Sequence, residues 1–200
     1  MISIGIYLYP DVEVLDFAGP FEVFSTASRV AGRARPEAPA PFAVTLVAAQ
    51  GGPVKARGGF TVLPDATLAS HAPLDVVLVP GGVHEPELER PELADWLRRQ
   101  ATSARLVASV CTGAFLLARA GLLDGLEVTT HGEDVADLRR TFPALTVREG
   151  ARWIEHERIM TSAGISAGLD MSLRIVARLA GEDLAERTAR QMEYDWRKRG

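Results

Sequence analysis

The chain has 200 residues, of which 47% are hydrophobic and 24% are charged, and it carries a formal net charge of −4 with a pI near 5.6. This length and composition fit one ordinary globular domain with a sizeable core, and they argue against two full domains. The acidic balance gives no general attraction to nucleic-acid phosphates or anionic lipid, and the only basic cluster is the final WRKRG. From this chain alone we expect no nucleic-acid partner.

The cysteine content and the N-terminus indicate the compartment. The single cysteine, Cys111, cannot form an internal disulfide, so a reducing compartment is the simpler expectation. The N-terminal MISIGIYLYP has no basic segment, and its apolar run of about nine residues is far shorter than the roughly 20 that cross a bilayer. We therefore expect a cytoplasmic protein with no membrane partner.

Continuous apolar runs predict strands that are covered on both faces, as in a parallel sheet. These runs lie at residues 2–8, 42–49, 74–80 and 104–110. Helical patterns lie between them, one beginning at Pro20 and one at Pro91, because proline favours the first turn of a helix. The alternation is typical of βαβ units.

The remaining segments are less regular. Residues 31–41 predict a surface loop, residues 51–68 a hairpin or an irregular excursion from the main sheet, and residues 145–162 a second β-rich excursion. Two helices over 165–181 and 182–199 close the chain. We therefore predict a single domain over residues 1–200, a three-layer α/β sandwich with a mostly parallel, flavodoxin-like central sheet. In such folds the ligand crevice lies at the carboxyl ends of the strands.

Cys111 follows the apolar run LVASV and precedes TGAFLLARAGLL, so it is expected at the carboxyl end of a strand that turns directly into a helix. This is the geometry of a nucleophile elbow, in which Gly113 permits close approach of neighbouring backbone. The helix N-terminus would then lower the pKa of the thiol. The alternative is that Cys111 is a small buried hydrophobic residue.

Two other predicted strand ends supply candidate partners for the thiol. Gly81 and Gly82 could join the backbone N–H of Thr112 in an anion-binding hole, or they could simply form a tight turn. Asp16 lies in an otherwise apolar stretch, where its carboxyl is either a helix cap or a reactive group in the crevice. A partly buried carboxyl beside a thiol should share a proton with it, which suits general acid–base chemistry.

The motifs LDFAGPFEVF, DVVLVPGG, SVCTGAFLLARAGLLDG with VTTH, and MTSAGISAGLDMSL occur in this order over almost the whole chain. In this order they resemble the DJ-1/PfpI superfamily, in particular its isonitrile hydratase branch and the amidotransferase-like domains of AraC-type regulators. The hydratase resemblance implies that Cys111 attacks the terminal carbon of an isonitrile, that Asp16 shuttles a proton, and that Thr112 contributes to the site. Water would then resolve a covalent thioimidate to give an N-substituted formamide.

The same resemblance implies a substrate-binding set of Gly19, Gly81, Gly82 and His131, with no metal and no organic cofactor. Because Gly132 follows His131 where an aromatic residue is usual in the resembled proteins, one wall of the pocket is expected to be reshaped. His131 is expected to be a hydrogen-bonded wall residue more often than a base. The other histidines have no partners at metal-ligand spacing.

Two other functions remain open from the sequence. The first is a ligand-sensing domain without catalysis, related to AraC-type regulators but lacking their helix-turn-helix region. The second is a redox sensor that uses a low thiol pKa at Cys111. The expected partner is a small-molecule substrate, and we expect apolar residues early in the chain to help form a homodimer, as is common in the resembled family.

Overall fold

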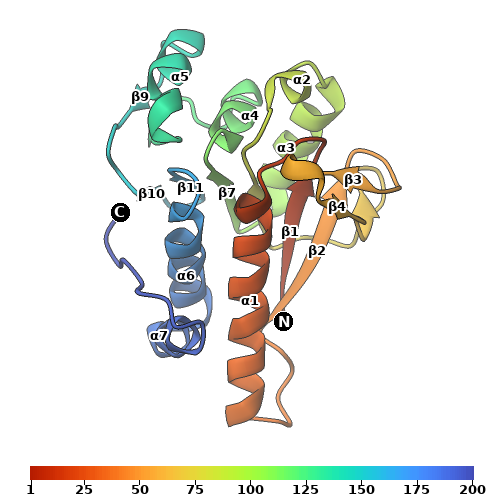
Figure 1. The fold of residues 1–200 in the computed structure, drawn as a ribbon, viewed down its shortest axis with the longest axis vertical. Coiled ribbons are helices and arrows are strands. Elements are labelled where there is room, and N and C mark those ends of the chain that lie inside the picture. Colours follow the sequence, from red (N-terminus) through yellow and green to blue (C-terminus); the bar gives the residue numbers. More distant parts are fainter.

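The computed structural model describes residues 1–200, and its central feature is a seven-stranded sheet (Figure 1). All neighbouring pairs are parallel except the pair at one edge, β10 with β11. The spatial order is β10-β11-β7-β6-β1-β2-β5, formed by β1 (Ile2–Leu8), β2 (Phe42–Ala48), β5 (Ala66–Thr67), β6 (Val76–Val79), β7 (Leu106–Val110), β10 (Trp153–Glu155) and β11 (Ile159–Ser162).

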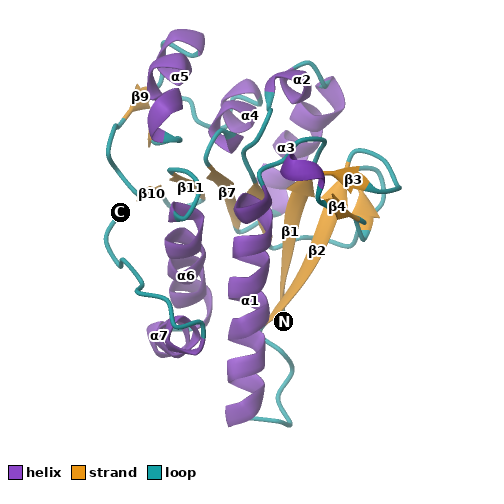
Figure 2. Cartoon of the chain, viewed as in Figure 1, coloured by secondary structure: helices purple, strands orange, loops and turns teal.

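Helices cover both faces of this sheet and complete three layers (Figure 2). Helices α1, α6 and α7 pack together on one face, while α3 and α4 pack against β6 and β7 on the other. The helices are α1 (Val14–Ala34), α2 (Glu85–Leu88), α3 (Pro91–Ser103), α4 (Gly113–Arg119), α5 (Val135–Thr141), α6 (Ala167–Ala180) and α7 (Glu182–Gln191), with 3-10 turns η1 (Arg57–Gly59) and η2 (Gly132–Asp134). None of them is both long enough and apolar enough to span a membrane.

The inner strands confirm the predicted fold class. Every residue of β6 and β7 is buried, as is the stretch Ile4–Leu8 of β1. A strand that is covered by helices on both faces has no solvent-exposed side, so polar and apolar residues do not alternate along it. This explains the continuous apolar runs. The α/β sandwich with a mostly parallel sheet follows from this pattern.

The first helix is longer at both ends than its sequence pattern predicts. It begins at Val14, so Pro20 lies inside the helix and not in its first turn. Because proline has no N–H, the helical hydrogen bond from position 20 to the carbonyl of Asp16 is absent, yet the helix continues without a break. Its C-terminal end at Ala34 also takes up the first residues of the loop predicted over 31–41.

The two β-rich segments differ in how far they leave the central sheet. Residues 51–68 contain the predicted hairpin, β3 (Val54–Lys55) with β4 (Thr61–Val62), but β5 returns to pair with β2 at the sheet edge. The prediction of an excursion over 145–162 is wrong for its second half, because β11 pairs with β7 inside the sheet. Within residues 145–162 only β9 (Thr146–Val147) lies outside the central sheet, where it pairs with β8 (Glu127–Val128).

The two C-terminal helices, in contrast to the first helix, are shorter than predicted. Helix α7 ends at Gln191, and the last residues form an extended segment instead of more helix. The backbone of Glu193 has a positive φ of 49°, a conformation that ends a right-handed helix. In α6, Leu173 and Val176 are buried as the apolar stripe predicts, while Leu169 and Leu179 are half-buried.

Candidate active site

Cys111 stands at the turn between β7 and α4, in the strained geometry of a nucleophile elbow. Its φ of 56° lies in the left-handed region that non-glycine residues rarely adopt. The turn is held by its neighbours: a side chain on Gly113 would collide with the carbonyl oxygen of Val79. The thiol therefore projects from a fixed backbone at the carboxyl end of an inner strand.

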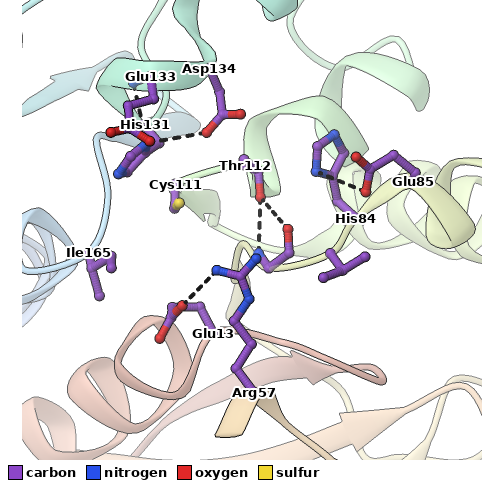
Figure 3. A pocket seen from close by; sticks show the side chains of 12 residues that line it. Glu13, Arg57, His84, Glu85, Cys111, Thr112, His131, Glu133, Asp134 and Ile165 are labelled. Carbon is purple, nitrogen blue, oxygen red and sulfur yellow. Dashed lines mark hydrogen bonds and ion pairs between the residues drawn. The ribbon is translucent and has the colours of Figure 1, made fainter.

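The sulfur lies in a pocket of about 280 Å³ whose wall is mostly polar (Figure 3). Loops that follow several different strands meet here, as expected at the carboxyl edge of a parallel sheet. The lining residues are Glu13, Arg57, Gly82, Val83, His84, Glu85, Cys111, Thr112, His131, Glu133, Asp134 and Ile165. The site thus combines one thiol with four carboxylates, one arginine and two histidines.

Asp16 does not line this pocket but is fully buried beside Cys111, in the first turn of α1. The residue in the N-cap position is Glu13, so the interpretation of Asp16 as a helix cap is wrong. Its Oδ2 accepts a hydrogen bond of 2.9 Å from the Gly81 backbone N–H. Its Oδ1 is buried and has no hydrogen-bond partner.

Burial raises the pKa of Asp16 to about 7, against the stabilising hydrogen bond from Gly81 and the smaller effect of the Cys111 thiol. Burial, and then the charge of Asp16, also raises the pKa of the Cys111 thiol well above its usual range. The expected low thiol pKa is therefore wrong: the Thr112 backbone N–H favours the thiolate, but desolvation outweighs it. Near neutral pH the pair keeps at least one proton between a carboxyl and a sulfur.

The glycine pair after β6 has a different role from the predicted anion-binding hole. The N–H of Gly81 is already bonded to Asp16, and the N–H of Gly82 donates to the Thr112 hydroxyl at 3.0 Å. That hydroxyl in turn donates to the Gly82 carbonyl at 3.1 Å. These bonds fix the aspartate and the threonine around the cysteine instead of leaving two free donors.

His131 forms one side of the pocket. Its Nδ1 lies 3.2 Å from Asp134 Oδ2 and 3.3 Å from the backbone nitrogen of Glu133, and it makes no hydrogen bond to the sulfur. The ring edge packs against Gly164, where an added Cβ would collide with it and would lie 2.8 Å from Cys111 Sγ. His131 therefore occupies the wall position that the sequence favours.

Gly19 is the one predicted site residue that the structure places elsewhere. It is buried in α1, where an added Cβ would lie 3.0 Å from Leu169 of α6, so it serves the contact between these two helices. Conversely, Val83, His84 and Glu85 directly follow Gly82 and line the pocket, so the strand-end rule could have found them. Arg57 comes from the hairpin excursion, and no sequence signal pointed to it.

No group of three or more His, Cys, Asp or Glu side chains lies close enough together to hold a metal ion. The two histidines of the pocket each face a single carboxylate, His84 facing Glu85 at 3.9 Å and His131 facing Asp134. The polar groups around the sulfur are therefore arranged as pairs.

The fold and the site define a class of protein. It is an α/β protein with a mostly parallel sheet, in which a cysteine with left-handed backbone conformation ends an inner strand and a buried carboxyl lies beside its sulfur. The chain belongs to the DJ-1/PfpI family, whose family model matches residues 2–178. The resemblance stated from the motifs is thereby confirmed.

Both enzymes and regulators are among the relatives. Isonitrile hydratase from Pseudomonas putida is 36% identical over 194 residues, which cover 96% of this chain and 78% of that protein. The HTH-type transcriptional regulator GbdR from Pseudomonas aeruginosa is 30% identical over 193 residues, and the match covers 96% of this chain but only 51% of the regulator. The chain thus spans about half the length of this regulator.

Solved structures give the same fold. A ThiJ/PfpI family protein from Pseudomonas syringae superposes with a TM-score of 0.83 at 28% identity, covering 97% of this chain and 75% of that one. An AraC family transcriptional regulator from Pseudomonas putida has a TM-score of 0.81 at 24% identity, covering 96% of this chain and all of that one. Both comparisons show the same fold over nearly the whole chain.

Proposed function

We propose that this protein, acting as one domain over residues 1–200, hydrates an isonitrile to an N-substituted formamide. The observation that carries the proposal is the buried carboxyl of Asp16, with one unpartnered oxygen, beside the elbow sulfur of Cys111. A thiol that stays protonated until a base takes its proton suits a reaction that uses both the sulfur and that proton. The 36% identity to isonitrile hydratase supports the substrate class.

The chemistry needs one thiol, one proton carrier and one water. As Cys111 sulfur bonds to the terminal carbon of R–N≡C, Asp16 takes the thiol proton and returns it to that carbon, which gives the thioimidate R–N=CH–S. Water then adds to the same carbon, and the carbon–sulfur bond breaks. The products are R–NH–CHO and the regenerated thiol, so the net reaction is addition of one water.

The pocket favours a small substrate without negative charge. Its volume of about 280 Å³ is at the lower end for small-molecule sites. Four carboxylates face one arginine in its wall, and that arginine, Arg57, is paired with Glu13 at 3.3 Å. A neutral alkyl or aryl isonitrile is therefore the substrate to test first.

The proposal predicts formamide formation by the wild-type protein. The purified protein is incubated with cyclohexyl isonitrile, the formamide is quantified by chromatography, and Cys111→Ala serves as the matched blank. Turnover by the wild type alone is the expected result. Wild-type turnover no faster than the blank, together with saturable binding of the isonitrile, would instead favour a ligand-sensing domain without catalysis.

We also propose a homodimer working in the cytoplasm, where a lone thiol stays reduced. Leu15 and Phe21 of α1 are large apolar side chains that are about two-fifths exposed. We expect light scattering at micromolar concentration to give twice the 21.6 kDa monomer mass. Phe21→Glu should shift the mass toward the monomer, whereas Leu63→Glu, on the hairpin side, should not; a wild-type monomer would contradict the proposal.

A further inference from the structure

One wall of the pocket is a short turn between β11 and α6, residues 163–166. Gly164 packs against both the Cys111 sulfur and the His131 ring, and Ile165 lines the cavity beside them (Figure 3). The turn belongs to neither the strand nor the helix. Its position must therefore be fixed by contacts from elsewhere in the chain.

Arg152 contacts this turn at both ends. Its carbonyl oxygen accepts a 2.8 Å hydrogen bond from the Ala163 backbone N–H, one residue beyond the β10–β11 ladder. Its guanidinium donates to Asp170 Oδ2 at 2.6 Å through Nε, and it reaches the Ser166 hydroxyl at 3.4 Å. One residue thus spans the wall from its first position to the helix that follows it.

The partner carboxylate is held from a third direction. Asp170 is fully buried, and its Oδ1 accepts a 2.9 Å hydrogen bond from the backbone N–H of Arg197. The Trp196 indole N–H donates to the Asp170 carbonyl at 3.2 Å. The C-terminal segment therefore covers Asp170, while the Arg152 side chain stays partly exposed.

An ion pair with one buried member is a weak source of stability, because desolvation of the buried Asp170 charge offsets much of the attraction. The contact between α6 and β10 does not depend on it, since Arg174 of α6 also pairs with Glu155 of β10 at 2.8 Å. The pair of Arg152 and Asp170 instead fixes the orientation of the turn, because a planar guanidinium holds several partners in one fixed geometry.

We propose that Arg152 and Asp170 are positioning residues, which hold the Gly164–Ile165 wall of the pocket against Cys111 from a site outside the pocket. Neither residue lines the cavity. The pair acts through the turn, and it sets how closely the wall approaches the sulfur. Loosening the pair opens the wall without changing any group that contacts a ligand.

The test uses the alkylation rate of the single thiol, so it does not depend on any hydratase activity. Iodoacetamide modification of Cys111 is followed by mass spectrometry in wild type, Arg152→Met, Arg152→Lys and the matched control Arg174→Met. We expect about tenfold faster alkylation in Arg152→Met through local opening of the wall. Arg152→Lys, which keeps the charge, should recover part of the difference, and Arg174→Met should stay within about twofold of wild type.

Urea unfolding of each variant separates a local effect from a global one. The proposal is supported if alkylation of Arg152→Met is faster at urea concentrations too low to change the folded fraction. It is overturned if Arg152→Met and Arg174→Met react at the same rate, or if the rate follows global stability alone. Should Arg152→Met fail to fold, an Arg152→Lys variant that folds and reacts like wild type would also overturn it.

Discussion

Substituting asparagine for Asp16 is expected to slow isonitrile hydration by about 10²- to 10⁴-fold, the usual contribution of a general acid–base group. Asparagine keeps the oxygen that accepts from Gly81, so the local fold should persist. At the same time, removing the carboxylate charge that raises the Cys111 pKa should make the thiol ionise at lower pH. Catalysis and thiol reactivity should therefore change in opposite directions.

The pH profile of iodoacetamide alkylation measures the second effect. Between pH 7 and 9 we expect faster alkylation in Asp16→Asn than in wild type. Asp134→Asn is the matched control, because Asp134 lies in the pocket and raises the thiol pKa by a smaller effect than Asp16 does. An Asp16→Asn profile that coincides with wild type would separate Asp16 from the thiol.

The same substitution should change the pH dependence of stability. The pKa of Asp16 is about 7 in the folded protein against 3.8 in the unfolded chain, so the folded state binds the proton more tightly. The corresponding stability is present below pH 4 and is lost as the pH rises to about 7. Asp16→Asn does not lose this stability. Between these pH values its free energy of unfolding in urea should therefore rise relative to that of wild type by a few kcal/mol.

Substituting alanine for Gly164 is expected to lower turnover by about 100-fold, since displacement of a reacting group by about 1 Å has an effect of this size. The new Cβ would lie 2.8 Å from Cys111 Sγ and would collide with His131, so both side chains must move. Overpacking of this kind should also lower the free energy of unfolding by roughly 1–3 kcal/mol.

Gly132→Ala provides the comparison for that substitution. Gly132 is exposed beside His131 at the pocket wall, and no atom lies within 4 Å of a Cβ placed there. Kinetics and thermal unfolding of the two variants should therefore diverge, with Gly132→Ala close to wild type. Equal activity in both variants would show that the wall at Gly164 can move freely.

Much of the architecture could be predicted because a strand that is buried on both faces appears in the sequence as a continuous apolar run. The runs that became β1, β6 and β7 are mostly apolar, with one serine each in β1 and β7, and the strand-end rule placed Cys111 and Thr112 at the crevice. The apolar pattern did not reveal β11, which is short and partly polar, although this strand lies in the sheet beside β7. A four-residue strand with threonine and serine carries too little pattern to distinguish it from an excursion.

The thiol environment could not be predicted for a different reason. Proximity of Asp16 and Cys111 follows from the motifs, but the direction of a pKa depends on how much water reaches both groups. In the folded protein Asp16 is completely buried and Cys111 is 7% exposed, so desolvation dominates over the hydrogen bond from the Thr112 backbone N–H. Likewise, whether the N–H groups of Gly81 and Gly82 are free depends on side chains from distant segments.

The hairpin that carries Arg57 is a part of the pocket wall that is separate from the central sheet. Its backbone joins the chain before α1 through hydrogen bonds from Asp11 to Lys55 and from Arg57 to Val12, but its own strands pair only with each other. Cys111 and Asp16, by contrast, stand on the inner sheet and the first helix, where any change disturbs the core. Exchange of this hairpin would therefore change the pocket wall at Arg57 while the strand and the helix that hold Cys111 and Asp16 stay as they are.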